Sequence, residues 1–171
     1  MIQTERLSIR RVQAGDWQAI QTVWKEVAKT AYARYDNPKD TADQAVQPRI
    51  ERWASFAGST EHMFFAVVLA DAVIGYIALN QRGRSHEIGY CFHPAYHGNG
   101  YAKESISAVL RAVKSMGIDC VTAGTALENA PSVRLLTSLG FRLAGTEKVS
   151  FYQDAQGNAI VFDGGIYELK L

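Results

Sequence analysis

The chain has 171 residues, 47% of them hydrophobic, which is enough for one well-packed core and too few for two comfortable domains. Its 18 Lys and Arg against 17 Asp and Glu leave a net charge of +1, so no bulk field gathers nucleic acid or an anionic membrane. We therefore expect a single domain over residues 1–171, with neither a nucleic acid nor a membrane as partner.

Targeting signals and cysteine pairs are not indicated. No apolar run approaches the roughly 18 residues that span a bilayer, and the start MIQTERLSIRR lacks the apolar stretch of a secretory signal. We expect a soluble, cytoplasmic protein. Cys91 and Cys120 form no CxxC motif or Cys/His cluster, so reduced thiols are expected, with neither a disulfide nor a metal site.

The first half of the chain alternates between strand and helix patterns. The segment RLSIRRV predicts a strand over residues 6–12, and Asp16 stands as an N-cap before apolar residues that recur at helical spacing over 17–27. A second helix is expected between residues 42 and 56, interrupted or started at Pro48. Two apolar runs joined around Asp71, residues 62–70 and 72–80, predict a hairpin, and residues 86–92 a further strand.

The second half begins with the clearest helix. From Gly100 the apolar stripe has helical period up to Met116, and Gly117 stands where the helix should end. Residues 118–125 predict a strand, residues 129–140 a short helix, and residues 141–149 and 160–171 a closing pair of strands. The expected order is βααββββαβαββ, with one strand more or less, in an α/β protein whose mixed sheet is covered by helices.

The stretch YHGNGYAKES, residues 96–105, places glycines at the mouth of the clearest helix. Glycines before a helix leave backbone N–H groups free to converge on an anion, and the helix dipole adds to the attraction. Gly98 and Gly100 would let the backbone come close, while Ala102 keeps the helix start uncrowded. The pattern indicates a phosphate ligand, with a plain turn as the alternative, and it is not a Walker loop because no Gly-Lys-Ser/Thr follows.

The segment GYCFHPAYHGNGYAKESISAVL resembles the acetyl-CoA-binding segment of the GNAT superfamily of N-acetyltransferases, with its Q/R-x-x-G-x-G/A motif before a long helix. TERLSIRRV, VIGYIAL, ENAPSVRLLTSLGF and GIYELKL extend the resemblance over nearly the whole chain, which is most similar to the ribosomal-protein-alanine (RimJ/RimL-type) group. This implies a mostly antiparallel central sheet with one splayed strand pair and flanking helices.

The resemblance also implies how acetyl-CoA, the expected cosubstrate, is held. Its pyrophosphate would rest on the main chain of the loop, where His97 replaces the usual Arg or Gln. The pantetheine arm would pair with the strand before the loop, and Asn129 and Ser132 match the family's N-x-x-S. The implied contacts are Tyr90, Cys91, Phe92, His97, Gly98, Asn99, Gly100, Tyr101, Ala102, Lys103, Asn129 and Ser132.

Acetyl transfer to an amine needs a proton acceptor, an oxyanion site and help for the departing thiolate. Glu87, at the start of the strand expected to carry the thioester, is the candidate base, directly or through water; the alternative is an ion pair with Arg82 or Arg84. A main-chain N–H near Phe92 would meet the oxyanion. Many relatives place a tyrosine where Leu136 stands, so Ser132 is the candidate for the sulfur.

Other groups leave alternatives open. Tyr101 and Tyr167 could replace Ser132 at the sulfur, an acetylated Cys91 would give a ping-pong mechanism, and Lys103, Arg111 and Lys114 could meet the 3′-phosphate. The aromatic faces of Tyr32 and Tyr35 with Asp36 could receive a cationic amine. The resemblance suggests a protein N-terminal amine as acceptor, with a polyamine or an aminoglycoside as the alternative acceptor. A non-catalytic acyl-CoA sensor is the alternative function, and a homodimer is left open.

Overall fold

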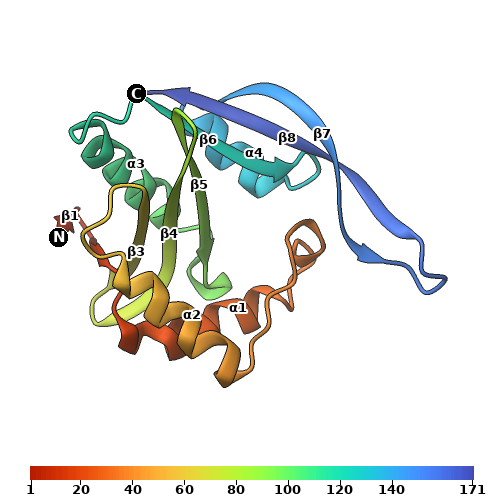
Figure 1. Ribbon diagram of the computed structural model, residues 1–171, viewed down its shortest axis with the longest axis horizontal. Coiled ribbons are helices and arrows are strands. Elements are labelled where there is room, and N and C mark those ends of the chain that lie inside the picture. Colours follow the sequence, from red (N-terminus) through yellow and green to blue (C-terminus); the bar gives the residue numbers. More distant parts are fainter.

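An eight-stranded sheet runs through the protein, and helices cover both of its faces (Figure 1). The computed structural model describes residues 1–171. In the order β1-β2-β3-β4-β5-β6-β8-β7, the strands span Ile2–Gln3, Leu7–Arg11, His62–Leu69, Ala72–Arg82, Ser85–Phe92, Cys120–Ala126, Ala159–Lys170 and Arg142–Gln153. Helices α1 to α4 span Trp17–Val27, Asp43–Ser55, Tyr101–Lys114 and Ala130–Ser138, and none is long and apolar enough to cross a membrane.

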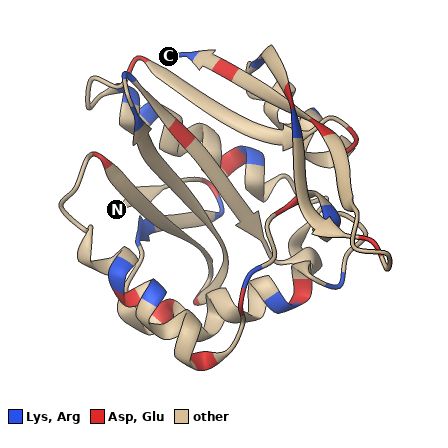
Figure 2. Ribbon diagram, turned by 45° about the vertical axis from the view of Figure 1, so that its right-hand side comes forward, with Lys and Arg blue, Asp and Glu red and all other residues tan.

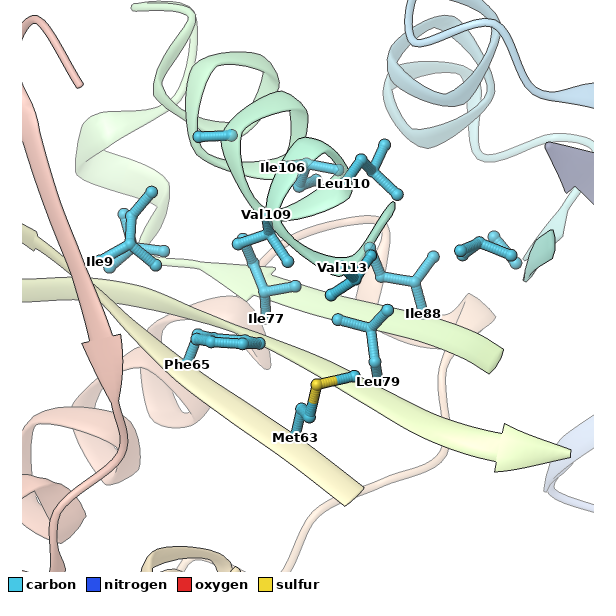
Figure 3. Close-up of a cluster of buried hydrophobic side chains, with 14 of the residues drawn as sticks. Ile9, Met63, Phe65, Ile77, Leu79, Ile88, Ile106, Val109, Leu110 and Val113 are labelled. Carbon is cyan, nitrogen blue, oxygen red and sulfur yellow. The ribbon is translucent and has the colours of Figure 1, made fainter. Parts of the chain in front are cut away.

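Two apolar clusters hold the helices against the sheet. On one face, Ile106, Val109 and Val113 of α3 are fully buried against residues of β4 and β5 such as Ile77 (Figure 3). On the other face, Ile20 and Trp24 of α1 and Val46 and Ile50 of α2 pack onto Phe64, Ala66, Tyr76 and Ala78 of β3 and β4. Removing this much apolar surface from water is the main stabilising term of the fold, at roughly 25 cal/mol per Å².

The predicted α/β class and mixed, mostly antiparallel sheet are confirmed. The expected order placed one strand before the first helix and four between the second and third helices. The structure has two strands before α1 and three between α2 and α3. The additional early strand, β1, has only two residues, Ile2 and Gln3, which pair with Ile9 and Ser8 of β2. A pairing this short leaves no readable alternation in the sequence.

The expectation at Pro48 was wrong. Helix α2 begins at Asp43 and runs through Pro48 to Ser55 without interruption. Proline removes one hydrogen-bond donor close to the start of the helix, and burial of Val46 and Ile50 on either side keeps the helix continuous.

The sheet opens between β5 and β6, as Figure 1 shows. These parallel strands pair only at His86 with Val121 and at Glu87 with Thr122. Past that point β5 continues to Phe92 beside β4 while β6 turns toward β8. The expected splayed strand pair is therefore β5 and β6, and one edge of β5 is left without a neighbouring strand.

The hairpin of β7 and β8 extends beyond the rest of the sheet (Figure 1). It reaches the segment between α1 and α2, where the Tyr152 hydroxyl donates to the Ala33 carbonyl at 3.3 Å. The rings of Tyr35 and Phe162 meet edge to face, with centroids 5.5 Å apart. The hairpin thus supports the α1–α2 segment beside the sheet opening.

Candidate active site

A cavity of about 1130 Å³ occupies the opening between β5 and β6. Its wall is drawn from both faces of the sheet: the α1–α2 segment, one face of α2, the middle of β3 to β5, the loop before α3, and the start of α4. One continuous space therefore joins the loop side to the α1–α2 side. Such a cavity can hold two reactants that meet inside the sheet opening.

The loop before α3 presents a run of unpaired backbone donors. The six consecutive N–H groups from Gly98 to Lys103 donate to no protein group, whereas that of His97 donates to Pro94 and that of Glu104 to Gly100. Gly98 and Gly100 have φ values of +78° and +80°, in the left-handed region that favours glycine. These donors stand at the positive end of a fourteen-residue helix, a suitable place for a diphosphate.

Hydrogen bonds from the side chains of His97 and Asn99 fix the conformation of this loop. The Nε2 of His97 lies 2.9 Å from the Phe92 carbonyl oxygen, and the Asn99 amide donates to the His97 carbonyl at 3.0 Å. His97 therefore ties the loop to the end of β5.

The N-terminal segment clamps the same loop. Arg6 donates to the Asn99 carbonyl at 3.0 Å, pairs with Glu104 at 2.6 Å, and lies 4.5 Å from the Tyr101 ring centroid. Burial alone would raise the pKa of Glu104, but hydrogen bonds from Thr4 and Arg6 outweigh it, and the pKa is lowered. Glu104 therefore stays ionised at neutral pH, and the clamp keeps both its charges.

The unpaired edge of β5 offers main-chain hydrogen-bond donors and acceptors to an extended ligand. In an antiparallel pair, successive residues of a strand point their main-chain N–H and C=O groups alternately toward and away from the partner strand. Because His93 donates to Ile74 of β4, Cys91 also bonds to β4. The main-chain groups of Tyr90 and Phe92 therefore face the opening. The Phe92 carbonyl is occupied by His97, which leaves its N–H free. This edge can pair with an amide-containing arm, and the Phe92 N–H can meet an oxyanion.

A pair of hydroxyls lies across the opening. Tyr90 of β5 and Ser132 of α4 are both in the cavity wall, with their oxygens 2.8 Å apart. Burial raises the pKa of Tyr90, although the hydrogen bond with Ser132 lowers it somewhat, so the phenol stays protonated at neutral pH. Sequence reasoning considered Tyr90 only for its main chain, because no local pattern shows that its hydroxyl reaches Ser132.

The other tyrosines and Asn129 are placed differently. Tyr167 is buried in the core outside the cavity, and Leu136 is buried there as well, so neither faces the opening. The Tyr101 ring lines the cavity under Arg6. Asn129 occupies the N-cap position of α4 without a capping hydrogen bond from its side chain, which is left available in the cavity wall.

Cys91 lines the cavity on the face opposite Tyr90. Burial, the largest cause, raises the pKa of its thiol to about 12. Because the thiolate is the nucleophilic form, the thiol is almost entirely inactive at neutral pH. The raised pKa of the Cys91 thiol argues against an acetylated cysteine as an intermediate.

Glu87 lies where β5 and β6 part, on the same face as Gly89 and Cys91. Its carboxylate accepts from Arg82 Nε at 3.0 Å and is about half exposed, with 48% of the side chain accessible. Arg82 and Gly89 line the cavity, whereas Glu87 lies just outside the wall. The predicted alternative partner, Arg84, makes no ion pair with it.

The cavity wall on the α1–α2 side contains Tyr32, Tyr35 and Asp36. The Asp36 carboxylate is paired with Lys39, so its charge is already met. Of the three basic residues considered for the 3′-phosphate, Lys103 lines the cavity and Arg111 and Lys114 do not.

The sheet opening, the six free amides and the cavity that reaches both faces fit the acyltransferase class. Residues 6–142 match the family model described as an acetyltransferase (GNAT) domain. The chain belongs to the GNAT acetyltransferase family.

Individual relatives agree with this assignment. The chain is 27% identical over 175 residues to the uncharacterized N-acetyltransferase YoaA of Bacillus subtilis (strain 168), covering 99% of this chain and 96% of YoaA. The crystal structure of a GNAT-family acetyltransferase from Bacillus anthracis has a TM-score of 0.78 at 25% identity, covering 99% and 97%. RimL, a ribosomal alpha-N-protein acetyltransferase in complex with coenzyme A, shares the fold at 13% identity, with a TM-score of 0.80 and coverage of 98% and 96%.

Proposed function

We propose that this protein transfers the acetyl group of acetyl-CoA to the N-terminal amine of a protein or peptide by direct attack. The observation that carries the proposal is the run of free N–H groups from Gly98 to Lys103 at the mouth of the sheet opening. Family membership supports acetyl-CoA as the donor. The likeness to RimL favours an N-terminal amine over a small-molecule amine.

The residues present fit the donor in three places. The six N–H groups suit the diphosphate, the free edge of β5 at Tyr90 and Phe92 suits the amide-bearing arm, and Asn129 with its uncommitted side chain stands beside that arm. Lys103 lines the cavity next to the amide run and suits a further phosphate. A donor held in this way has its thioester in the cavity, between Tyr90 and Cys91 of β5 and Ser132 of α4.

The chain's groups then serve each part of the reaction. The amine nitrogen forms a bond to the acetyl carbon, and the carbon–sulfur bond breaks. The Phe92 N–H donates to the oxygen on which negative charge develops. Ser132 donates a proton toward the departing sulfur, and Tyr90 donates to Ser132 in turn. Before the attack, the acceptor ammonium loses one proton through water to Glu87, whose carboxylate is not part of the cavity wall. The neutral amine then attacks, and the second proton that its nitrogen loses on forming the amide restores the Ser132–Tyr90 pair.

Glu87→Gln tests the proton path. We expect kcat/KM to fall about 100-fold at pH 7 and less than about tenfold at pH 9, because an α-amino group with a pKa near 8 then loses its proton without help. The measurement is the initial rate of CoA release from acetyl-CoA with an N-terminal peptide, recorded from pH 6 to 9.5.

Glu61→Gln is the matched control, since Glu61 is an exposed carboxylate outside the cavity and its loss should leave the pH profile unchanged. An equal loss for Glu87→Gln at every pH would remove Glu87 from proton transfer. Binding of acetyl-CoA without release of CoA on adding N-terminal peptides, polyamines or aminoglycosides would contradict the enzyme and indicate a sensor. Release only with small amines would contradict the proposed acceptor.

A further inference from the structure

One face of α2 forms a wall of the cavity. Arg49, Arg52, Trp53 and Phe56 line the space, and their spacing of three, one and three residues places them on one side of the helix. Trp53 stacks on Phe64 with ring centroids 4.6 Å apart, which fixes this face against the sheet. The helix face that carries the two exposed arginines is therefore held in place by aromatic packing.

Neither arginine has an acidic partner. Arg49 lies over the Trp24 ring at 5.6 Å and makes no ion pair, and the Arg52 side chain makes neither an ion pair nor a hydrogen bond. The other two cations that line this side of the cavity are already matched, Lys39 by Asp36 and Arg82 by Glu87. Two guanidinium groups thus remain available to a ligand.

Positively charged side chains are concentrated in the cavity wall. Acidic and basic positions are interspersed over the ribbon in Figure 2, and the whole chain has a net charge of only +1. The charged residues of the cavity wall are five cations and one carboxylate, namely Lys39, Arg49, Arg52, Arg82, Lys103 and Asp36. Low-dielectric walls strengthen such a field and favour an anionic occupant.

The donor's phosphates do not account for these arginines. The amide run and Lys103 belong to α3, which packs on one face of the sheet, whereas α2 packs on the opposite face with Val46 and Ile50. Arg49 and Arg52 therefore lie on the acceptor side of the opening. Guanidinium groups recognise carboxylates through paired hydrogen bonds, so the geometry suits a carboxylate carried by the acceptor.

We infer that the acceptor is an acidic peptide, whose N-terminal amine enters the sheet opening while a carboxylate near that amine binds Arg49 and Arg52. This rests on the proposed transfer to an N-terminal amine and adds the chemistry that selects the substrate. A polycationic acceptor is disfavoured by the same arginines, since like charges repel inside a partly closed space.

The experiment compares three tetrapeptide amides, Ala-Asp-Asp-Ala, Ala-Asn-Asn-Ala and Ala-Arg-Arg-Ala. We expect kcat/KM for the acidic peptide to exceed that for its Asn isostere about tenfold at low salt, with the Arg peptide poorest. The ratio should fall as salt is added. In the double variant Arg49→Gln with Arg52→Gln, the ratio of kcat/KM for the acidic peptide to that for the Asn peptide should approach 1. The control double variant, Arg84→Gln with Arg134→Gln, changes exposed positions outside the cavity and should keep the wild-type ratio.

A second readout separates this inference from the proposed function. Peptide binding to the acetyl-CoA complex is followed by tryptophan fluorescence, because Trp24 lies under Arg49 and Trp53 is in the cavity wall. If the acidic peptide binds about tenfold tighter and the arginine double variant loses that preference, the anion site stands even where no peptide is acetylated. Equal binding and turnover of the acidic and Asn peptides would overturn the inference and leave the enzyme proposal intact; no binding by any peptide would overturn both.

Discussion

Gly100→Val should weaken acetyl-CoA binding about 100-fold. Gly100 has φ of +80° and ψ of 0° immediately before α3, and a β-branched residue strains that conformation by about 1–2 kcal/mol. Relief of the strain turns the neighbouring peptide groups away from their common target. Two charge-assisted hydrogen bonds lost at about 1.5 kcal/mol each correspond to the expected factor, measured as the Kd by calorimetry.

Gly117→Val is the matched control for this change. Gly117 has φ of +85° just beyond the other end of the same helix, and no atom lies within 4 Å of the Cβ that the substitution adds. Both variants should lose similar thermal stability, because both force a valine into the left-handed region. Only Gly100→Val should lose affinity; an unchanged Kd for Gly100→Val, or an equal loss for Gly117→Val, would contradict the role of the loop.

Ser132→Ala should lower kcat about 100-fold with little change in the KM for acetyl-CoA. Removing the hydroxyl takes away the proton donor for the departing thiolate, whose pKa is near 8.5, and general acids contribute factors of about 10² to 10⁴. Tyr90→Phe should lower kcat about 30-fold, because Tyr90 acts on the sulfur through Ser132. Since the pair acts as a unit, the double variant should be no slower than Ser132→Ala alone.

The coupling between Ser132 and Tyr90 is measured as a double-mutant cycle, from the single-turnover rates of the two single variants and the double variant. Ser138→Ala is the control, because its hydroxyl lies on the same helix and bonds only to the Leu135 carbonyl. Burial raises the pKa of Tyr90, so the phenol should keep its proton, and the rate should show no loss from its ionisation below about pH 10. Losses that multiply in the double variant would contradict the shared path through Ser132.

Much of the fold was readable because its signals are local. The apolar stripe of α3, with Gly117 at its end, lies within one element, and the two apolar runs on either side of Asp71 each form one strand, β3 or β4. The two-residue strand β1 could not be seen, because its only signal is pairing with β2. The sequence at Pro48 was misread because tertiary burial of Val46 and Ile50 outweighs a local helix breaker.

The loop before α3 was predictable from the residues themselves because it is built from contiguous chain. The loop from Gly98 to Lys103 is one segment, so its unpaired N–H groups followed from glycines before a helix. The contact between Tyr90 and Ser132 joins residues 42 positions apart, and the Arg6 clamp joins the chain start to Asn99, 93 positions away. Such contacts depend on how the sheet and helices pack, which no single segment encodes.

The proposed function depends above all on the backbone amides of residues 98–103 binding the diphosphate of acetyl-CoA. The most direct measurement is a titration of ¹⁵N-labelled protein with acetyl-CoA, followed by amide NMR, in which the two loop glycines are easily recognised. We expect large downfield shifts of the Gly98 and Gly100 amide protons, and inorganic pyrophosphate should shift them in the same direction. Saturation of the protein with acetyl-CoA while these two amides stay unmoved would contradict it.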